Sequence, residues 1–124
     1  MPEIVRINLD KILITIESTG YVSAVDISES LKTVQRINNQ MGISKVIIDA
    51  THLVQLPTEP ILHSLAADLV KLPSNMMYAF VVNESSPTVI NYMQTVAQFK
   101  GITVEIFTNQ DKGEAWLKGK TNTK

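Results

Sequence analysis

Cysteine is absent from the 124 residues of this chain. Its absence excludes disulfides, thiolate nucleophiles and cysteine-ligated metals. Histidine is scarce as well, and the two that occur, His52 and His63, do not form the paired spacing that zinc sites use. The 5 glycines do not form the phosphate-binding loop of dinucleotide-binding or P-loop proteins. We therefore expect neither a metal nor a cofactor.

The chain also lacks an excess of charge of either sign. It contains 11 Lys and Arg residues and 12 Asp and Glu residues, so its formal net charge is -1. Such a balance predicts no attraction for nucleic acid or for membrane surfaces. The first residues, MPEIVRINLDKIL, place acids among the apolar positions and contain no long apolar run. Neither a signal peptide nor a membrane span is predicted from them. We expect a cytoplasmic protein without a nucleic-acid partner.

Apolar residues, by contrast, are plentiful, since 44% of the chain is hydrophobic and 19% is charged. This composition is typical of a globular protein, and the length fits one domain with its own core. We predict a single domain over residues 1–119, followed by a flexible polar tail over residues 120–124.

The strands of the first half are predicted from two kinds of apolar pattern. Apolar and polar residues alternate over 5–9 and again over 12–16, which predicts a hairpin of two half-buried strands. The β-branched run over 46–48 is continuous, as in a central parallel strand that is covered on both faces. We expect this strand to end at Asp49.

A helix is predicted between the hairpin and the central strand. Asp26, with Glu29 three residues later, is the arrangement in which an acid caps the first amides of a helix. Gly42 is expected to end that helix. Its buried stripe is expected to consist of Ile27, Leu31, Val34, Ile37 and Met41.

The second half of the chain continues the alternation of helices and strands. The pattern predicts a helix from Pro60 to before Pro73, a strand over 77–82, a helix from Ser86, a strand over 102–106, and a short helix opened by Thr108 and Asp111. Trp116, between Ala115 and Leu117, is expected to be largely buried and to lock the last helix to the sheet.

The resulting order is strand, strand, helix, strand, helix, strand, helix, strand, helix. Strands that alternate with helices pair in parallel through right-handed crossovers, while the hairpin turns the first strand antiparallel. We therefore predict an α/β fold with a mixed, mostly parallel sheet of about five strands and about four helices.

The candidate chemistry is concentrated between Lys45 and Ser64, where the central strand passes into the next helix. Sites of open α/β sheets lie at such crossings. The polar side chains of this segment are Asp49, Thr51, His52, Thr58, Glu59 and His63. Asp49 is expected to accept backbone amides of the following loop. The residue pattern leaves Thr58 open as a helix N-cap or as a phosphoacceptor.

A hydrolytic triad of Thr58, His52 and Asp49 is disfavoured. No glycine flanks Thr58 to form a nucleophile elbow, and the neighbouring prolines remove amides that an oxyanion hole would use. We therefore predict no catalytic residue, and an enzyme is the least favoured interpretation.

The stretch VIIDATHLVQLPTEPILHSL and the ending EIFTNQDKGEAWLKG, together with the order of elements, resemble the STAS domains of anti-sigma-factor antagonists, and in particular their SpoIIAA-like branch. In those domains the central strand ends in Asp, as at Asp49, and a loop leads to an Asp-Ser pair whose serine is phosphorylated by a partner kinase. Pro57 falls at the place of that Asp and Thr58 at the place of that Ser.

The resemblance implies a non-catalytic regulatory or protein-interaction domain that docks a partner through residues 51–63. The residues implied are Thr58, Pro57, Glu59, Asp49, Thr51 and His52. The implied partner is a protein of the kinase or anti-sigma type, and a homodimer is left open.

The alternative is a carrier of a small or apolar ligand, held between the helices and the strand ends, which the SpoIIAA-like branch also suggests. An exposed apolar surface near Val54, Leu56 and Ile61 would favour docking, whereas a closed pocket would favour the carrier.

Overall fold

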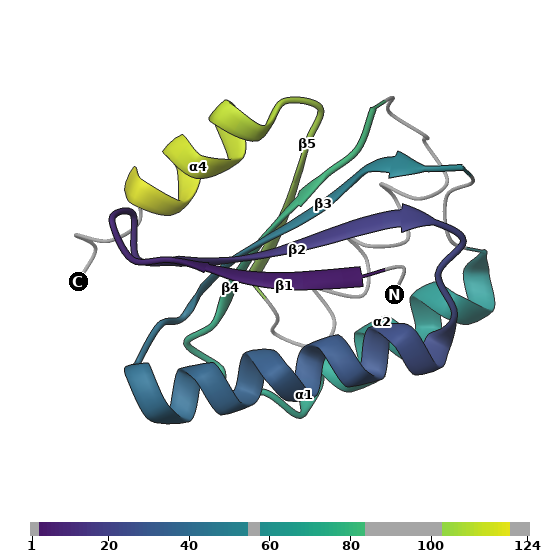
Figure 1. Ribbon diagram of the computed structural model, residues 1–124, viewed down its shortest axis with the longest axis horizontal. Helices are drawn as coiled ribbons and strands as arrows, with labels where there is room; N and C mark the ends of the chain where they lie inside the picture. Colours follow the sequence, from purple (N-terminus) through teal and green to yellow (C-terminus); the bar gives the residue numbers. More distant parts are fainter. Residues whose placement is uncertain (1–2, 55–57, 84–102, 120–124) are drawn as a thin grey trace.

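A five-stranded mixed sheet forms the centre of the molecule (Figure 1). The computed structural model describes residues 3–54, 58–83 and 103–119. The elements are β1 (Glu3–Asn8), β2 (Leu13–Gly20), α1 (Ala24–Met41), β3 (Lys45–Leu53), α2 (Glu59–Val70), β4 (Met77–Val81), β5 (Thr103–Phe107) and α4 (Gln110–Gly119). The strand order is β1-β2-β3-β4-β5, in which β1 is antiparallel to β2 and the other pairs are parallel.

The predicted fold class and the number of strands are thus confirmed. The described residues contain three helices. The helix expected from Ser86 and the tail predicted to be flexible both lie outside the described residues. None of the described helices is long and apolar enough to cross a membrane.

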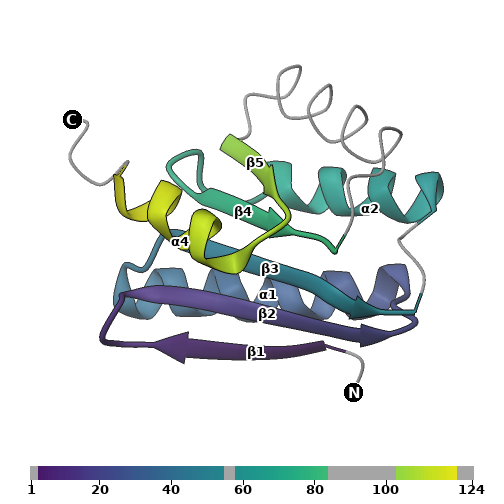
Figure 2. The same ribbon diagram turned by 90° about the horizontal axis from the view of Figure 1, so that it is seen from above.

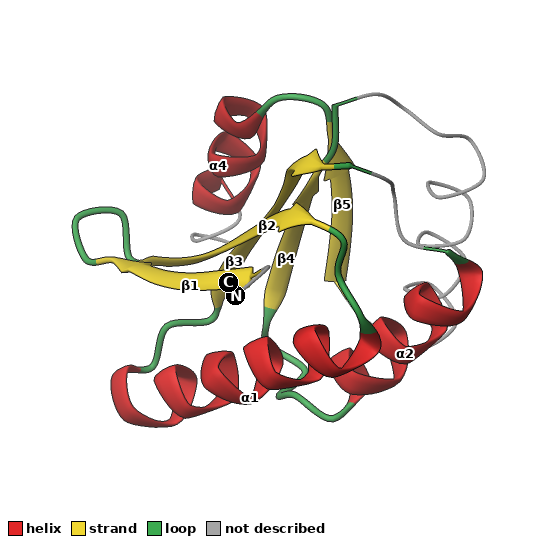
Figure 3. Cartoon of the chain, turned by 45° about the vertical axis from the view of Figure 1, so that its right-hand side comes forward, coloured by secondary structure: helices red, strands yellow, loops and turns green. Residues whose placement is uncertain are grey.

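Helices cover both faces of the sheet, with α1 and α2 on one face and α4 on the other (Figure 3). The side chains of β3 alternate between the two layers. Val46 and Ile48 join the core against α1 and α2, whereas Ile47 joins a second core with Leu117 of α4. The apolar run in the sequence is uninterrupted because both faces of β3 are buried, one under α1 and α2 and the other under α4.

The start of α1 lies earlier than the sequence predicted. Ser23 is the N-cap: its hydroxyl accepts the amide of Asp26 at 3.1 Å, and the Asp26 carboxylate accepts the amide of Ser23 at 2.9 Å. Asp26 is therefore the third residue of a capping box and not the cap itself. The predicted start, after Asp26, was late by the three residues Ala24, Val25 and Asp26, because none of these side chains is buried and no apolar pattern reveals them. Gly42, at φ 72°, ends the helix as predicted.

The apolar stripe of α1 is confirmed except at its last member. Ile27, Leu31, Val34 and Ile37 are buried in the core, but Met41 is exposed. The chain reverses at Gly42, and Ile43 is buried in the same core immediately afterwards. Ile43 thus provides the apolar side chain at the end of α1 that the stripe assigned to Met41.

The central strand is longer than predicted, since β3 continues from Asp49 to Leu53. Its extension pairs with Thr19 and Gly20, the last residues of an equally extended β2. A register shift between Glu17 and Thr19 accompanies this pairing. The short-range pattern did not predict the extension, because it depends on a partner strand and not on local propensity.

The closing helix α4 is held by Leu117, which is fully buried, and not chiefly by Trp116. Trp116 is only partly buried, with its ring centroid 5.8 Å from that of Phe107. The expectation of a largely buried Trp116 was therefore wrong, because the face of α4 that lies on the sheet is formed by Gly113 and Leu117, one turn apart, and Trp116 is not on that face. The N-terminus of α4 is capped by Asn109 and not by Thr108 as predicted. The side chain of Asn109 accepts the backbone amide of Lys112 at 3.2 Å.

Candidate functional site

The carboxyl ends of β2 and β3 lie at one edge of the sheet, and α1 begins at the same edge (Figure 2). The backbone amide of Val54 donates to the carbonyl of Gly20 at 3.0 Å, which keeps the two strand ends together. We call this edge the strand-end surface and define it by Tyr21, Val25, Thr51, His52, Val54 and Thr58.

The carboxylate of Asp49 is buried and engaged locally. Its Oδ1 accepts the backbone amide of Thr51 at 2.9 Å and the hydroxyl of Thr51 at 2.6 Å. Asp49 lies inside β3 and not at its end, so the expected amide comes from the strand itself. The side-chain amide of Asn83, which follows β4, donates to the carbonyl of Thr51. This hydrogen bond connects the last part of β3 to the end of β4. Asp49 therefore orders the strand end.

Thr58 occupies the N-cap position of α2 with extended backbone, and its side chain is exposed. Within the described residues its hydroxyl makes no capping hydrogen bond. The capping role that the sequence suggested is thus not observed, and the hydroxyl faces the surface. Pro57 lies outside the described residues, and Glu59 is the first residue of α2.

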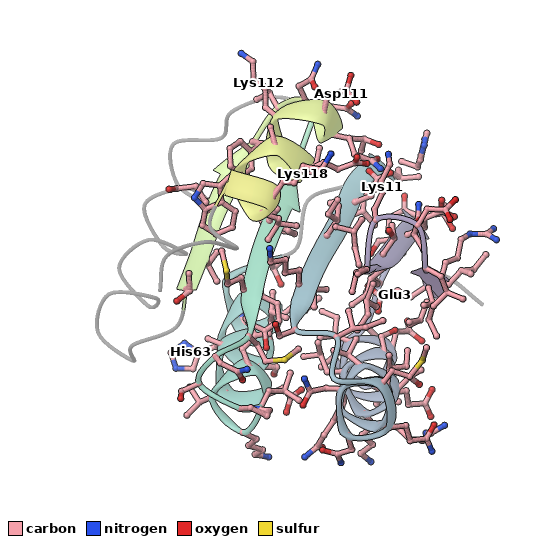
Figure 4. All side chains as sticks on the ribbon, turned by 90° about the vertical axis from the view of Figure 1, so that its left-hand side faces the viewer. Glu3, Lys11, His63, Asp111, Lys112 and Lys118 are labelled. Carbon is pink, nitrogen blue, oxygen red and sulfur yellow. The ribbon has the colours of Figure 1, made fainter. Side chains whose placement is uncertain are left out.

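The two histidines lie on different elements. His52 is exposed on β3 opposite Thr19, and His63 projects from the outer side of α2 (Figure 4). Both of these hydrogen bonds to Asp49 come from Thr51, and neither comes from His52. Within the described ranges, no group of three or more acidic, histidine or cysteine side chains is arranged to hold a metal ion.

Three apolar side chains are exposed on the strand-end surface. Tyr21 is 70% exposed, Val25 is 66% exposed and Val54 is 67% exposed. The sequence predicted an exposed apolar side chain at Val54. It did not predict Tyr21 and Val25 as members of this surface, because their position depends on the unexpected start of α1. Ile61 is partly buried against the core, and Leu56 lies outside the described residues. The exposed apolar surface that would favour docking is therefore present around Val54.

A small cavity lies between the strand ends and the two helices, where a carried ligand was expected. Its volume is about 20 Å³. The Ser18 hydroxyl donates to Glu3 Oε2 at 2.7 Å, while Glu3 Oε1 is buried without a hydrogen-bond partner in the described part of the chain. A cavity of this volume holds about one water molecule. This cavity, as the described residues form it, is too small for a carried ligand.

No family model and no curated protein matches this chain. Four chains in solved structures do match, two of them as follows. An anti-sigma factor antagonist from Mycobacterium paratuberculosis matches with a TM-score of 0.70 at 13% identity, over 94% of this chain and 92% of that chain. An uncharacterised protein with a SpoIIAA-like fold from Shewanella loihica matches with a TM-score of 0.61 at 13% identity, over 93% of this chain and 91% of that chain. The chain has the SpoIIAA-like fold.

The resemblance to STAS domains is therefore confirmed at the level of the fold. On this SpoIIAA-like fold the predicted residues form two groups. Asp49, Thr51 and His52 belong to one strand, and the first two are hydrogen-bonded. Thr58 and Glu59 belong to the start of the following helix. The SpoIIAA-like arrangement thus presents an exposed hydroxyl at a helix start and an exposed apolar surface at the strand ends.

Proposed function

We propose that this chain is a non-catalytic regulatory domain that binds a protein partner through the strand-end surface. The observation that carries the proposal is the exposure of Tyr21, Val25 and Val54 at the edge where β2 and β3 end. Further support comes from the fold, which the chain shares with an anti-sigma factor antagonist.

The chemistry of the strand-end surface suits a partner with an apolar centre and a polar rim. Burying one valine side chain contributes about 1.5 to 3 kcal/mol, and tyrosine is among the residues that most often dominate binding energy. His52 is exposed on β3 two residues before Val54, where it provides a hydrogen-bonding group for a rim.

Thr58 gives this surface a means of regulation. Its exposed side chain lies at the N-terminus of α2, where the positive end of the helix dipole favours an added negative charge. A phosphate there would be tolerated by the fold. It would also place about two negative charges beside an apolar interface, where the cost of desolvation opposes binding. Phosphorylation of Thr58 would therefore release the partner.

The test compares two substitutions of equal chemistry at opposite ends of the sheet. Val54→Glu places a charge on the strand-end surface. Leu9→Glu places the same charge at the hairpin, where Leu9 is 66% exposed. Both variants and the unaltered chain would be used in quantitative affinity capture from the native cell, followed by titration calorimetry with the purified partner.

We expect Leu9→Glu to retain the same partner with unchanged affinity, and Val54→Glu to weaken binding by at least tenfold, about 1.4 kcal/mol. Circular dichroism would establish that both variants are folded. Equal binding by all three proteins would contradict the proposal, as would equal loss in both variants.

A further inference from the structure

The first strand of the sheet, β1, has a neighbour on one side only. It stands at the end of the strand order and pairs with β2 along all 6 of its residues (Figure 2). Among residues 3–54, 58–83 and 103–119, no other strand pairs with it. An open edge of this kind presents a row of N–H and C=O groups, to which a further strand can add.

The edge of β1 lacks the features that usually protect a sheet from such addition. Natural edge strands carry lysine, proline or a β-bulge. β1 contains neither lysine nor proline, and its register with β2 has no shift. Its one cation is Arg6, whose Nε lies 3.2 Å from Glu17 Oε1. Ile4 and Ile7 are 44% and 41% exposed, so the edge is apolar and open.

A groove of about 260 Å³ lies between β1 and the N-terminal half of α1. We call it the acidic groove and define it by its lining, which consists of Glu3, Val5, Asp26, Glu29, Ser30 and Thr33. Three of these residues carry carboxylates, and none carries a positive charge. Within the described ranges, none of the three carboxylates belongs to an ion pair. The acidic groove therefore attracts positive charge.

Glu3 offers this groove an acceptor that has no partner. Its side chain lies on the side of the sheet that faces α1 (Figure 4). Its Oε2 accepts the Ser18 hydroxyl at 2.7 Å, whereas its Oε1 is buried without a hydrogen-bond partner in the described part of the chain. A buried acceptor calls for a donor, and a charged donor forms the stronger hydrogen bond.

The cations nearest to the acidic groove in the sequence fix the end at which a positive charge would bind. Lys32 and Arg36 are exposed on α1, lie beyond the lining and follow Glu29 by about one and two turns. They would repel a basic ligand at that end. Arg6 projects to the opposite face of the sheet, because side chains alternate along β1. The attraction is therefore greatest near Glu3, where α1 begins.

We propose that the edge of β1 binds an extended basic segment of a partner protein, which adds to the sheet as a further strand and places a lysine or arginine in the acidic groove. Main-chain hydrogen bonds supply affinity in strand addition, and alternate side chains supply specificity. Side chains that lie opposite each other on paired strands share a face of the sheet. The side chain opposite Glu3 would therefore enter the acidic groove.

A second copy of this chain fits the edge less well. On the side that faces α1, β1 carries Glu3, Val5 and Ile7. No antiparallel register of two β1 strands therefore places a positive charge opposite Glu3. The proposal is also independent of the proposed docking function, because the edge of β1 shares no residue with the strand-end surface and its test needs no partner from the cell.

The test is a titration of the full chain with synthetic peptides, followed by amide NMR at an ionic strength held constant with sodium chloride. The probe is a capped eight-residue peptide of alternating lysine and threonine. We expect saturable shifts of the amides of residues 3–8 and 26–33. A peptide of alternating glutamate and threonine is expected not to bind. The lysine peptide methylated at every backbone nitrogen keeps its charge but cannot donate to β1, and we expect it to bind at least tenfold more weakly.

Three substitutions of glutamate locate the site. Glu3→Gln is expected to weaken binding of the lysine peptide at least tenfold, and Glu29→Gln several-fold. Glu105→Gln is the matched control, because Glu105 is exposed on β5, the strand at the other edge of the sheet, and its replacement should leave binding unchanged. Glu29 is exposed, so Glu29→Gln keeps the proposal testable if Glu3→Gln does not fold.

Four results would overturn the proposal. One is the absence of saturable shifts in residues 3–8. Equal binding of the methylated and unmethylated peptides is another, since charge alone would then explain it. The third is equal weakening by Glu29→Gln and Glu105→Gln. The last is a shift of the same amides when the chain is concentrated without peptide, which would assign the edge to a second copy.

Discussion

Replacement of Leu117 by alanine tests how α4 is attached to the sheet. Leu117 is fully buried and packs with Leu13, Ile47, Ala79 and Val81, which belong to three paired strands. Because strand pairing holds these neighbours in place, the cavity left by the substitution cannot collapse easily. The expected loss is therefore about 3 to 5 kcal/mol, in the upper part of the range for Leu→Ala in cores. A domain of this kind has a total stability of about 5 to 15 kcal/mol.

Trp116→Ala is the matched comparison, because Trp116 directly precedes Leu117 in the same helix and its replacement removes more atoms. Trp116 is only partly buried and contacts Phe107, so its loss is expected to cost less than Leu117→Ala and less than the about 3 to 5 kcal/mol of a fully buried aromatic. Urea denaturation followed by circular dichroism would measure both variants. A larger loss for Trp116→Ala would refute the assignment of Leu117 as the residue that anchors α4.

Three further predictions concern single groups. The buried hydroxyl of Tyr78 has no hydrogen-bond partner in the described ranges. Tyr78→Phe is therefore expected to raise the free energy of unfolding by about 1 to 3 kcal/mol, as measured by urea denaturation. A loss of stability would contradict this expectation. The hydrogen bond from Lys11 lowers the pKa of Glu114, so their pair stabilises the fold above the ordinary glutamate pKa of 4.5 and ceases to do so as the pH falls through the lowered value. Glu114→Gln should therefore be less stable than the unaltered chain at neutral pH and equal to it in acid, and a difference that persists in acid would argue against the ion pair. Thr58→Glu should fold with a stability change of at most about 1 kcal/mol and lose the partner, as circular dichroism and affinity capture would show; unfolding would mean that Thr58 is a packed residue.

Much of the fold could be predicted because its buried residues repeat at the period of their element. Ile27, Leu31 and Val34 face the sheet at helical spacing, and the run over 46–48 is covered on both faces. Local patterns failed where a distant partner decides the structure. The end of β3 at Leu53 depends on pairing with Gly20, which lies far back in the chain.

The candidate sites show the same division between local and distant causes. Thr58 could be placed at a helix start because Pro60 follows it closely. The exposure of Tyr21 and Val25 could not be predicted, since it depends on how the chain enters α1 from Ser23.

The central claim is that the strand-end surface contacts a protein partner, and site-specific photo-crosslinking tests it most directly. A photoreactive phenylalanine analogue would be incorporated at position 54 in one variant and at position 9 in another, and both would be irradiated in the native cell. We predict one distinct covalent adduct from position 54 that is absent from position 9 and disappears when Thr58→Glu is added. The same adducts from both positions, or an adduct from position 9 alone, would contradict the claim.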